Sequence, residues 1–371
     1  MNYDAQRIVG ALAIRPGAVP SIVCTRPVIG ESMMQRLVQG RPAATLPGVI
    51  ASVFTLCAAA QRQTAQRAVQ AALGTAGDPE HVQDRLALAA STAREHLLRL
   101  ALELPMQVPR AGVAIDPFWL RDAPVLRLPP VPDRLALQQA VGALPAWLEQ
   151  QLLGMTPERW LAGWQQDGEG WLAHWATLQP HSAARWLDAV RDEARAIALP
   201  GRPLDVLDDP AAGMPVLAAA LAGQPGFAER PLWCGAPAET GPWTRLGHTT
   251  PVHTAWARLG ARIADLLRVA CGERPACGAL GTAPGEGIAW SEMSRGLLVH
   301  WVRLAPGERD PASACAERYH VLAPTEWNFH PDGALGRALA AGQLAAGSAQ
   351  LATAVLDPCV PFSIEKEAPH A

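Results

Sequence analysis

The amino-acid sequence predicts a mainly α-helical fold with a few short strands, an α+β class. Alanine- and leucine-rich stretches with helical spacing occupy most of the 371 residues, whereas β-favouring residues gather only near the beginning and around 286–304. With 49% hydrophobic residues, the chain is long enough to bury a sizeable core. We expect a single domain over residues 1–371, with a possible internal boundary in the proline-rich stretch 105–135.

The first elements are two strands and a long helix. Residues 7–14, "RIVGALAI", alternate apolar with small residues, and residues 20–29, "PSIVCTRPVI", are a candidate partner strand. Residues 47–73 begin at a proline and end just before Gly74, so they predict a long helix. A break in this helix is possible near Cys57.

A second helix is predicted over residues 78–104, with Asp78 as N-cap and Pro79 at the first helical position. The following residues 105–135 are rich in proline and indicate an irregular connection. A free linker is not expected there, because this stretch carries apolar side chains that need cover: Ile115, Phe118, Trp119 and Leu120.

Residues 136–198 predict short helices that carry many tryptophans, some of them one helical turn apart. A tryptophan-packed helix layer is the interpretation we favour, and a binding platform is the alternative. The side chains concerned are Trp147, Trp160, Trp164, Trp171, Trp175 and Trp186.

The last third predicts two further helices and a group of strands. One helix is expected over 251–271, stopping at Gly272, and an alanine-rich one over 333–356. Between them, residues 286–304 mix glycine turns with β-favouring residues and indicate strands.

Composition excludes several functions. The net charge is −3 and no basic stripe with interleaved aromatic residues occurs, so nucleic acid is not expected as a partner. Lys366 is the single lysine, which excludes a Schiff-base mechanism elsewhere. No run of 18 apolar residues and no secretion signal is visible, so we expect no membrane partner and a cytoplasmic location, with the seven cysteines reduced.

Two stretches at opposite ends of the chain present cysteines in a suggestive context. Residues 54–69 read "FTLCAAAQRQTAQRAV" and residues 356–365 read "LDPCVPFSIE". They resemble the two metal-binding motifs of the large subunit of nickel–iron hydrogenases, R-x-C-G-x-C-x-x-x-H-x-x-A-x-x-R-A and D-P-C-x-x-C-x-x-H. On this resemblance Cys57 corresponds to the second cysteine of the first pair, and Cys359 to the first cysteine of the second pair.

Four further blocks in the same order strengthen the resemblance. Residues 7–14 are similar to the opening R-I-E-G-H-L pattern of that family, and residues 235–245, "GAPAETGPWTR", to G-x-P-x-E-x-G-P-L-A-R. Residues 291–301, "SEMSRGLLVHW", resemble E-A-P-R-G-x-L-x-H-W, and residues 324–333, "PTEWNFHPDG", resemble P-T-x-W-N-x-x-P-R-D. The blocks span nearly the whole chain, so the resemblance implies the helical core of a hydrogenase large subunit.

Departures from the motifs remove parts of the hydrogenase chemistry. Phe54 and Phe362 stand in place of two of the four cysteines, and Gln61 and Glu365 in place of the histidines. The proton-relay glutamate of the family falls on Val9, and the arginine over the diatomic ligands falls on Asp332. A nickel–iron centre with four thiolates is therefore not expected, and neither is hydrogen turnover or any other enzyme activity.

The chain thus resembles the hydrogenase accessory proteins called HupK or HoxV, which are implicated in assembling the metal centre. The resemblance implies a scaffold or carrier that holds the Fe(CN)2(CO) precursor transiently, without nickel, through the metal ligands Cys57 and Cys359. Asp357 and Arg295 are further candidates for cofactor binding, the first as an extra donor and the second as the positive neighbour that favours a thiolate. Expected partners are maturation chaperones of the HypC type, HypD and the hydrogenase large subunit. The alternative is a protein-interaction chaperone of hydrogenase assembly that carries no metal.

Overall fold

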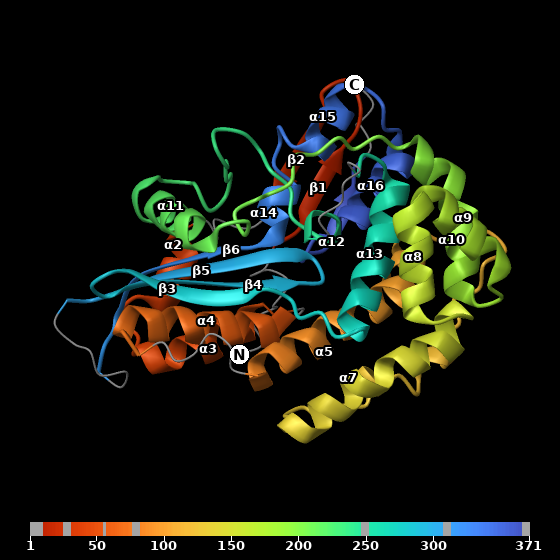
Figure 1. The fold of residues 1–371 in the computed structure, drawn as a ribbon. Helices are drawn as coiled ribbons and strands as arrows, with labels where there is room; N and C mark the ends of the chain where they lie inside the picture. The colour runs from red at the N-terminus through yellow and green to blue at the C-terminus, as the bar shows by residue number, and fades with distance from the viewer. Residues whose placement is uncertain are drawn as a thin grey trace, which may run out of the picture.

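The computed structural model describes residues 10–24, 31–54, 57–75, 82–245, 252–306 and 313–365. The fold is mainly α-helical with two small sheets, as predicted. Figure 1 shows the larger sheet lying above helices α3 (Leu46–Val53) and α4 (Ala58–Leu73), with a group of helices to one side.

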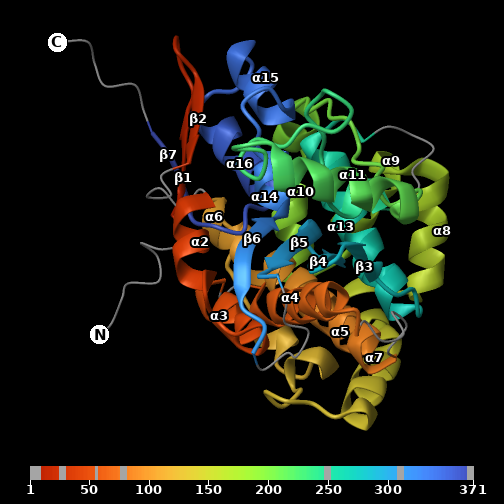
Figure 2. The same ribbon diagram turned by 90° about the vertical axis from the view of Figure 1, so that its left-hand side faces the viewer.

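The smaller sheet joins the two ends of the described chain. Strand β1 (Leu12–Arg15) pairs antiparallel with β2 (Ser21–Cys24) and parallel with β7 (Phe362–Ile364). Figure 2 shows these strands together at one edge of the molecule. The predicted pair 7–14 and 20–29 is confirmed over its described part, whereas residues 7–9 and 25–29 lie outside it and β7 was not predicted.

The larger sheet is antiparallel, in the order β3 (Cys277–Ala283), β4 (Glu286–Met293), β5 (Gly296–Leu304) and β6 (Ala316–Leu322). It contains the predicted strand region 286–304. Helix α4 packs on one face of this sheet, and α11 (Pro210–Gly223) contacts β3 and β4. Gly287 permits the close approach, because a Cβ there would lie 2.2 Å from the Ala68 carbonyl oxygen.

The predicted helix 47–73 is two helices, with the break at the predicted place. Helix α3 ends at Val53, and α4 begins after Cys57, its N-cap residue. Gly74 terminates α4 in the left-handed conformation, with φ of 70°. The 3-10 turn Ala43–Thr45 leads into α3 and follows helix α2 (Glu31–Val38).

The second predicted helix ends three residues later than the predicted residue 104. Helix α5 (Val82–Leu98) continues through a π-helical turn, Arg99–Glu103, into α6 (Leu104–Gln107). The predicted cap residues Asp78 and Pro79 lie outside the described residues.

The connection after α6 is irregular, as predicted, with short 3-10 turns at Phe118–Leu120 and Pro124–Leu126. Leu120 is buried, but Phe118 keeps 74% of its surface exposed, so the prediction that it is covered was wrong. The domain boundary in this stretch stays a prediction.

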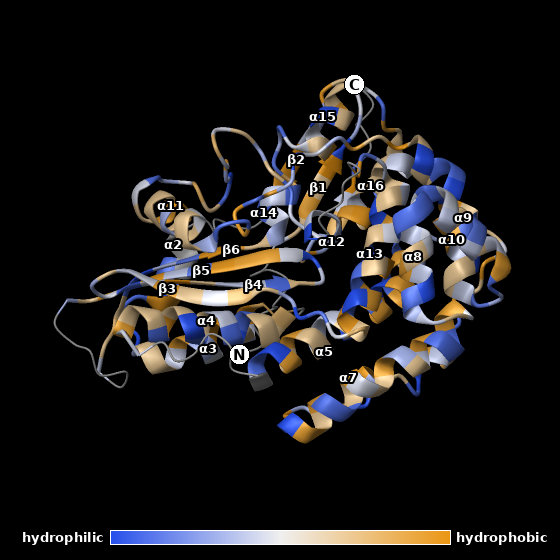
Figure 3. Ribbon diagram, viewed as in Figure 1, coloured by the Kyte–Doolittle hydropathy of each residue, from blue (hydrophilic) through white to orange (hydrophobic). Residues whose placement is uncertain are grey.

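The tryptophan-rich region forms the helical layer that we favoured. It consists of α7 (Arg134–Leu148) with a π-helical extension Glu149–Leu153, α8 (Pro157–Asp167), α9 (Glu169–Leu178) and α10 (Ser182–Ala196). Trp160 is fully buried, stacks on Trp164 at 5.9 Å between ring centroids and meets Trp175 edge-on. Alternating hydrophobic and hydrophilic stripes mark these helices as a layer with one buried side (Figure 3).

Helix α13 (Ala255–Ala270) lies between this layer and the larger sheet and is buried along almost its whole length. It begins at the N-cap Thr254, later than the predicted residue 251. The predicted helix 333–356 is two, α15 (Ala334–Ala340) and α16 (Ala346–Leu356), because Gly342 takes a positive φ of 68° between them. The short helices α12 (Pro242–Arg245) and α14 (Pro324–Asn328) complete the fold.

Candidate metal-fragment site

Cys57 is presented by the break between α3 and α4. As the N-cap of a 16-residue helix it lies at the positive end of the helix dipole, and its side chain is 4% exposed. Gln61, one turn further along α4, is fully buried and donates from Nε2 to the Cys57 Sγ at 3.6 Å. In the motif resemblance described above, Gln61 stands in place of the histidine of the first hydrogenase motif.

Cys359 is presented by the segment that connects α16 to β7, and it is 5% exposed. Thr325, on α14, fixes this residue at two points. Its Oγ1 accepts a hydrogen bond from the Cys359 backbone N–H at 2.9 Å and lies 2.8 Å from the Cys359 Sγ. The sulfur is therefore held against a buried hydroxyl.

The structure brings the two thiols and Arg295 into one electrostatic neighbourhood. Both cysteines belong to the same hydrophobic core. Burial, together with the charges of Cys359 and Glu95, raises the pKa of Cys57 to about 12, although Arg295 and the Gln61 hydrogen bond act to lower it. The expected positive neighbour is present, but burial outweighs it. Cys57 is thus a protonated thiol at neutral pH, and a metal has to displace that proton.

Asp357 lies directly beyond α16 in the left-handed region, with φ of 55°, and is 2% exposed. Its Oδ1 is 3.0 Å from Arg99 Nε and 3.3 Å from Arg295 Nε, and its Oδ2 is 2.9 Å from Arg262 Nη2. None of these contacts has hydrogen-bond geometry, so the attraction is mainly between charges. Although burial acts in the opposite direction, Arg295, Arg99 and Arg262 together hold the pKa of Asp357 down to about 2.

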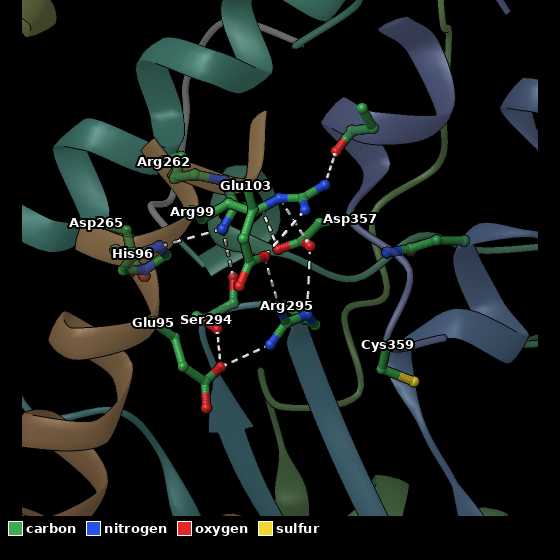
Figure 4. A network of polar contacts seen from close by, with 12 residues as sticks. Glu95, His96, Arg99, Glu103, Arg262, Asp265, Ser294, Arg295, Asp357 and Cys359 are labelled. Carbon is green, nitrogen blue, oxygen red and sulfur yellow. Dashed lines mark hydrogen bonds and ion pairs between the residues drawn. The ribbon is translucent and has the colours of Figure 1, made fainter. Parts of the chain in front are cut away.

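Arg295 joins Asp357 to a second carboxylate on α5. Its Nη1 lies 2.8 Å from Glu95 Oε2, which also accepts a hydrogen bond from the Ser294 hydroxyl. Figure 4 shows Arg295 between Glu95 and Asp357, with Cys359 further along the same chain segment as Asp357. The guanidinium that we predicted beside the thiols therefore lies between two acids, of which Asp357 is buried and Glu95 is partly exposed.

The polar network continues into helix α13. Arg262 Nη1 lies 3.2 Å from His96 Nδ1, and His96 Nε2 lies 2.7 Å from Asp265 Oδ2, which also accepts from Arg245 at 2.7 Å. Burial lowers the pKa of His96 to about 4, so this imidazole is neutral at pH 7.

Sequence reasoning missed Glu95, His96, Arg99 and Asp265 because no motif contains them. The sequence of α13 does contain an indication of this network: Arg262 lies four residues after Arg258, and Asp265 lies three residues after Arg262. Charged residues at this spacing along an otherwise apolar helix indicate a buried polar stripe.

The other positions that depart from the hydrogenase motifs are dispersed. Phe54 is buried, Phe362 is half-buried in β7, and Glu365 is ion-paired to Arg15 at 2.7 Å near the surface. The Asp332 side chain is 85% exposed. Val9 lies outside the described residues. Among the residues that the structure describes, no group of three or more His, Cys, Asp or Glu side chains is arranged to hold a metal ion.

Two residues from the other motif blocks have structural roles. Glu239 Oε2 accepts from Trp243 Nε1 at 3.1 Å and from Arg258 at 2.7 Å, which fixes the Gly/Pro-rich turn. His300 is fully buried and its Nδ1 lies 2.6 Å from the Tyr319 hydroxyl. Both side chains are thus tied into the core.

The described helices include none that is both long and apolar enough to cross a membrane. The cytoplasmic location stays a prediction.

Comparisons with known proteins agree with the motifs. No protein-family model matches the chain. It is 40% identical to the hydrogenase expression/formation protein HoxV of Cupriavidus necator, over 97% of this chain and 96% of that protein. It is also 30% identical to HupK of Azotobacter vinelandii over 90% of each.

Solved structures give the same fold. A chain of an NAD+-reducing [NiFe]-hydrogenase superposes with a TM-score of 0.53 at 14% identity, covering 91% of this chain and 92% of that chain. A [NiFeSe]-hydrogenase chain of Dm. baculatum gives a TM-score of 0.50 at 12% identity, covering 91% and 93%. The chain therefore has the fold of a hydrogenase large subunit and belongs to the HoxV/HupK family of hydrogenase expression/formation proteins.

Proposed function

We propose that this chain is a non-catalytic scaffold or carrier in nickel–iron hydrogenase maturation. It holds the Fe(CN)2(CO) precursor transiently through the thiolates of Cys57 and Cys359 and passes it to the hydrogenase large subunit. The observation that supports this proposal is that both thiols are buried in one core, where Cys57 contacts Gln61 and Cys359 contacts Thr325. They also lie at positions that resemble metal ligands of the large subunit.

The chemistry of two buried thiols suits this cargo. A low-spin ferrous ion with cyanide and carbonyl ligands is soft, and thiolate sulfur binds soft ions well. Two sulfurs hold the fragment less firmly than the four of a complete nickel–iron centre, so release stays possible. The raised pKa of Cys57 favours release further, since the sulfur regains a proton readily when the iron departs.

The contacts of Asp357 support a positioning role rather than the extra-donor role considered from the sequence. Both carboxylate oxygens face guanidinium groups, so coordination to iron would have to displace Arg99, Arg262 or Arg295. We infer that Asp357 fixes the segment that presents Cys359 and orients Arg295. The charge of Arg295 then offsets part of the negative charge that two thiolates bring into the core.

The names of the relatives, expression/formation proteins, are consistent with an accessory, non-catalytic role. The proposed partners are chaperones of the HypC type, HypD and the hydrogenase large subunit. The large-subunit-like fold supports a second candidate, a chaperone that binds these partners and carries no metal.

Infrared spectroscopy separates the two candidates. The protein is purified without oxygen from cells that express the maturation system, with Cys57→Ala and Cys359→Ala variants beside it. A carrier shows cyanide and carbonyl stretching bands that both variants lose while remaining folded. If the bands are absent from a protein that still binds its partners, the chaperone function is the correct one.

A further inference from the structure

Each thiol of the proposed pair has a buried side chain directed at its sulfur, and neither of these side chains belongs to the proposed ligand set. Gln61 approaches Cys57 and Thr325 approaches Cys359. Gln61 is 0% and Thr325 4% exposed, so neither hydrogen bond competes with bulk water.

The carboxamide of Gln61 is unusual because only one end has a partner. Nε2 donates to the Cys57 sulfur, whereas Oε1 is buried without a hydrogen-bond partner among the described residues. An orphaned buried acceptor is unfavourable. The orientation of the carboxamide is explained if the sulfur needs the N–H group as a donor, because a metal-bound thiolate accepts hydrogen bonds and donates none.

Thr325 is likewise placed to donate a hydrogen bond to its sulfur. Its oxygen already accepts the backbone N–H of Cys359, and the hydroxyl carries one proton. When Cys359 is a thiolate, that proton is the donor in the contact of 2.8 Å between Oγ1 and Sγ. The two elements α4 and α14 therefore each supply one X–H group to one sulfur.

We propose that Gln61 and Thr325 are positioning residues for the cargo: each donates a hydrogen bond to one sulfur of the Cys57–Cys359 pair in the metal-bound state and so sets the strength of the iron–sulfur bonds. This inference rests on the proposed function. A hydrogen bond to a thiolate draws electron density from the sulfur, which stabilises the charge in the core and weakens donation to the metal. Such tuning suits a carrier, which has to bind and also to let go.

The test uses Cd²⁺ as a probe of the pair in the full-length, reduced protein. Binding is measured by titration calorimetry and by the ultraviolet thiolate-to-cadmium charge-transfer band. The Cys57→Ser/Cys359→Ser double variant gives the background from the remaining five cysteines: Cys24, Cys234, Cys271, Cys277 and Cys315.

Thr325→Val keeps the shape of the side chain and removes the hydroxyl, and Gln61→Leu keeps most of the bulk and removes the amide, and neither adds a metal ligand. Each substitution leaves a thiolate charge in the core without its hydrogen bond, and we expect this loss to outweigh the stronger donation of the sulfur to the metal. Each is therefore expected to weaken Cd²⁺ binding at the pair about tenfold and to shift the charge-transfer band to lower energy. Thr325→Ser keeps the hydroxyl and is expected to restore the affinity and the band position. A role in packing alone moves the unfolding midpoint but not the band.

The outcomes distinguish this inference from the proposed function. If Thr325→Val and Gln61→Leu leave both affinity and band unchanged while the double cysteine variant falls to background, the hydrogen-bond inference is overturned and the thiol pair stands. If the wild type binds no more Cd²⁺ than the double cysteine variant, the pair itself fails, and the proposed function with it.

Discussion

Replacing Asp357 by asparagine tests whether the polar cluster is held together by this one carboxylate. The substitution keeps the shape of the side chain and removes its charge. Three guanidinium groups lie within 3.3 Å of the carboxylate oxygens, and its side chain is 1% exposed. Arg99 and Arg295 keep other acidic neighbours, Glu103 and Glu95, whereas Arg262 loses a partner at 2.9 Å.

Two routes give the size of the effect. The pKa of Asp357 falls from its ordinary value of 3.8 to about 2, which corresponds to about 2.5 kcal/mol of stability. Removing one partner of a buried ion pair costs about 3–5 kcal/mol. We therefore expect Asp357→Asn to lower the free energy of unfolding by about 3 kcal/mol at pH 7.

The assay is urea denaturation at several pH values, with Asp332→Asn as the matched control. The Asp332 side chain is 85% exposed, so its substitution is expected to change stability by less than about 0.5 kcal/mol. Because the folded-state pKa of Asp357 lies below the unfolded value, its contribution is complete above pH 4 and is lost as the pH falls towards 2. The difference between wild type and Asp357→Asn is thus expected to shrink over that range. A cost at pH 7 no greater than that of the control would refute the account of the cluster.

Three further predictions concern two glycines and a buried carboxyl group. Gly287→Ala is expected to lower the free energy of unfolding by at least about 2 kcal/mol, because its Cβ would lie 2.2 Å from the backbone of α4. Gly347→Ala, with no atom within 4 Å of the new Cβ, is the control and is expected to stabilise α16 by about 0.5–1 kcal/mol in the same denaturation assay. Burial raises the pKa of Glu292 from 4.5 to about 7, so its contribution is present below pH 4.5 and is lost as the pH rises through 7. Glu292→Gln is therefore expected to remove a decline of up to about 3 kcal/mol between these pH values in chemical denaturation curves, and an unchanged decline would contradict the assignment.

Much of the fold was predictable because the helical pattern and its interruptions are local. The break near Cys57 and the stop at Gly74 were read from the sequence and are present in the structure. Strand β3 was missed because "CGALGTA" consists mostly of small residues, which carry little β signal until they pair with β4. The division at Gly342 was missed because an isolated glycine in an alanine-rich run is compatible with a continuous helix.

The candidate site was predictable only where a motif marks it. The resemblance pointed to four residues, all of which are buried in the structure: Cys57, Arg295, Asp357 and Cys359. It could not show that three arginines converge on Asp357, since Arg99 and Arg262 come from helices far apart in the sequence. The contact between Thr325 and Cys359 was hidden for the same reason, whereas Gln61 lies only one helical turn after Cys57 in the first motif.

The most direct test of the central claim counts the sulfur ligands of the carried iron. X-ray absorption at the iron edge is measured on protein purified without oxygen from cells that express the maturation system. The account predicts two sulfur neighbours around the iron in the wild type and loss of the iron signal in both Cys57→Ala and Cys359→Ala. Iron bound with no sulfur neighbour, or with the same sulfur count after either substitution, would contradict it.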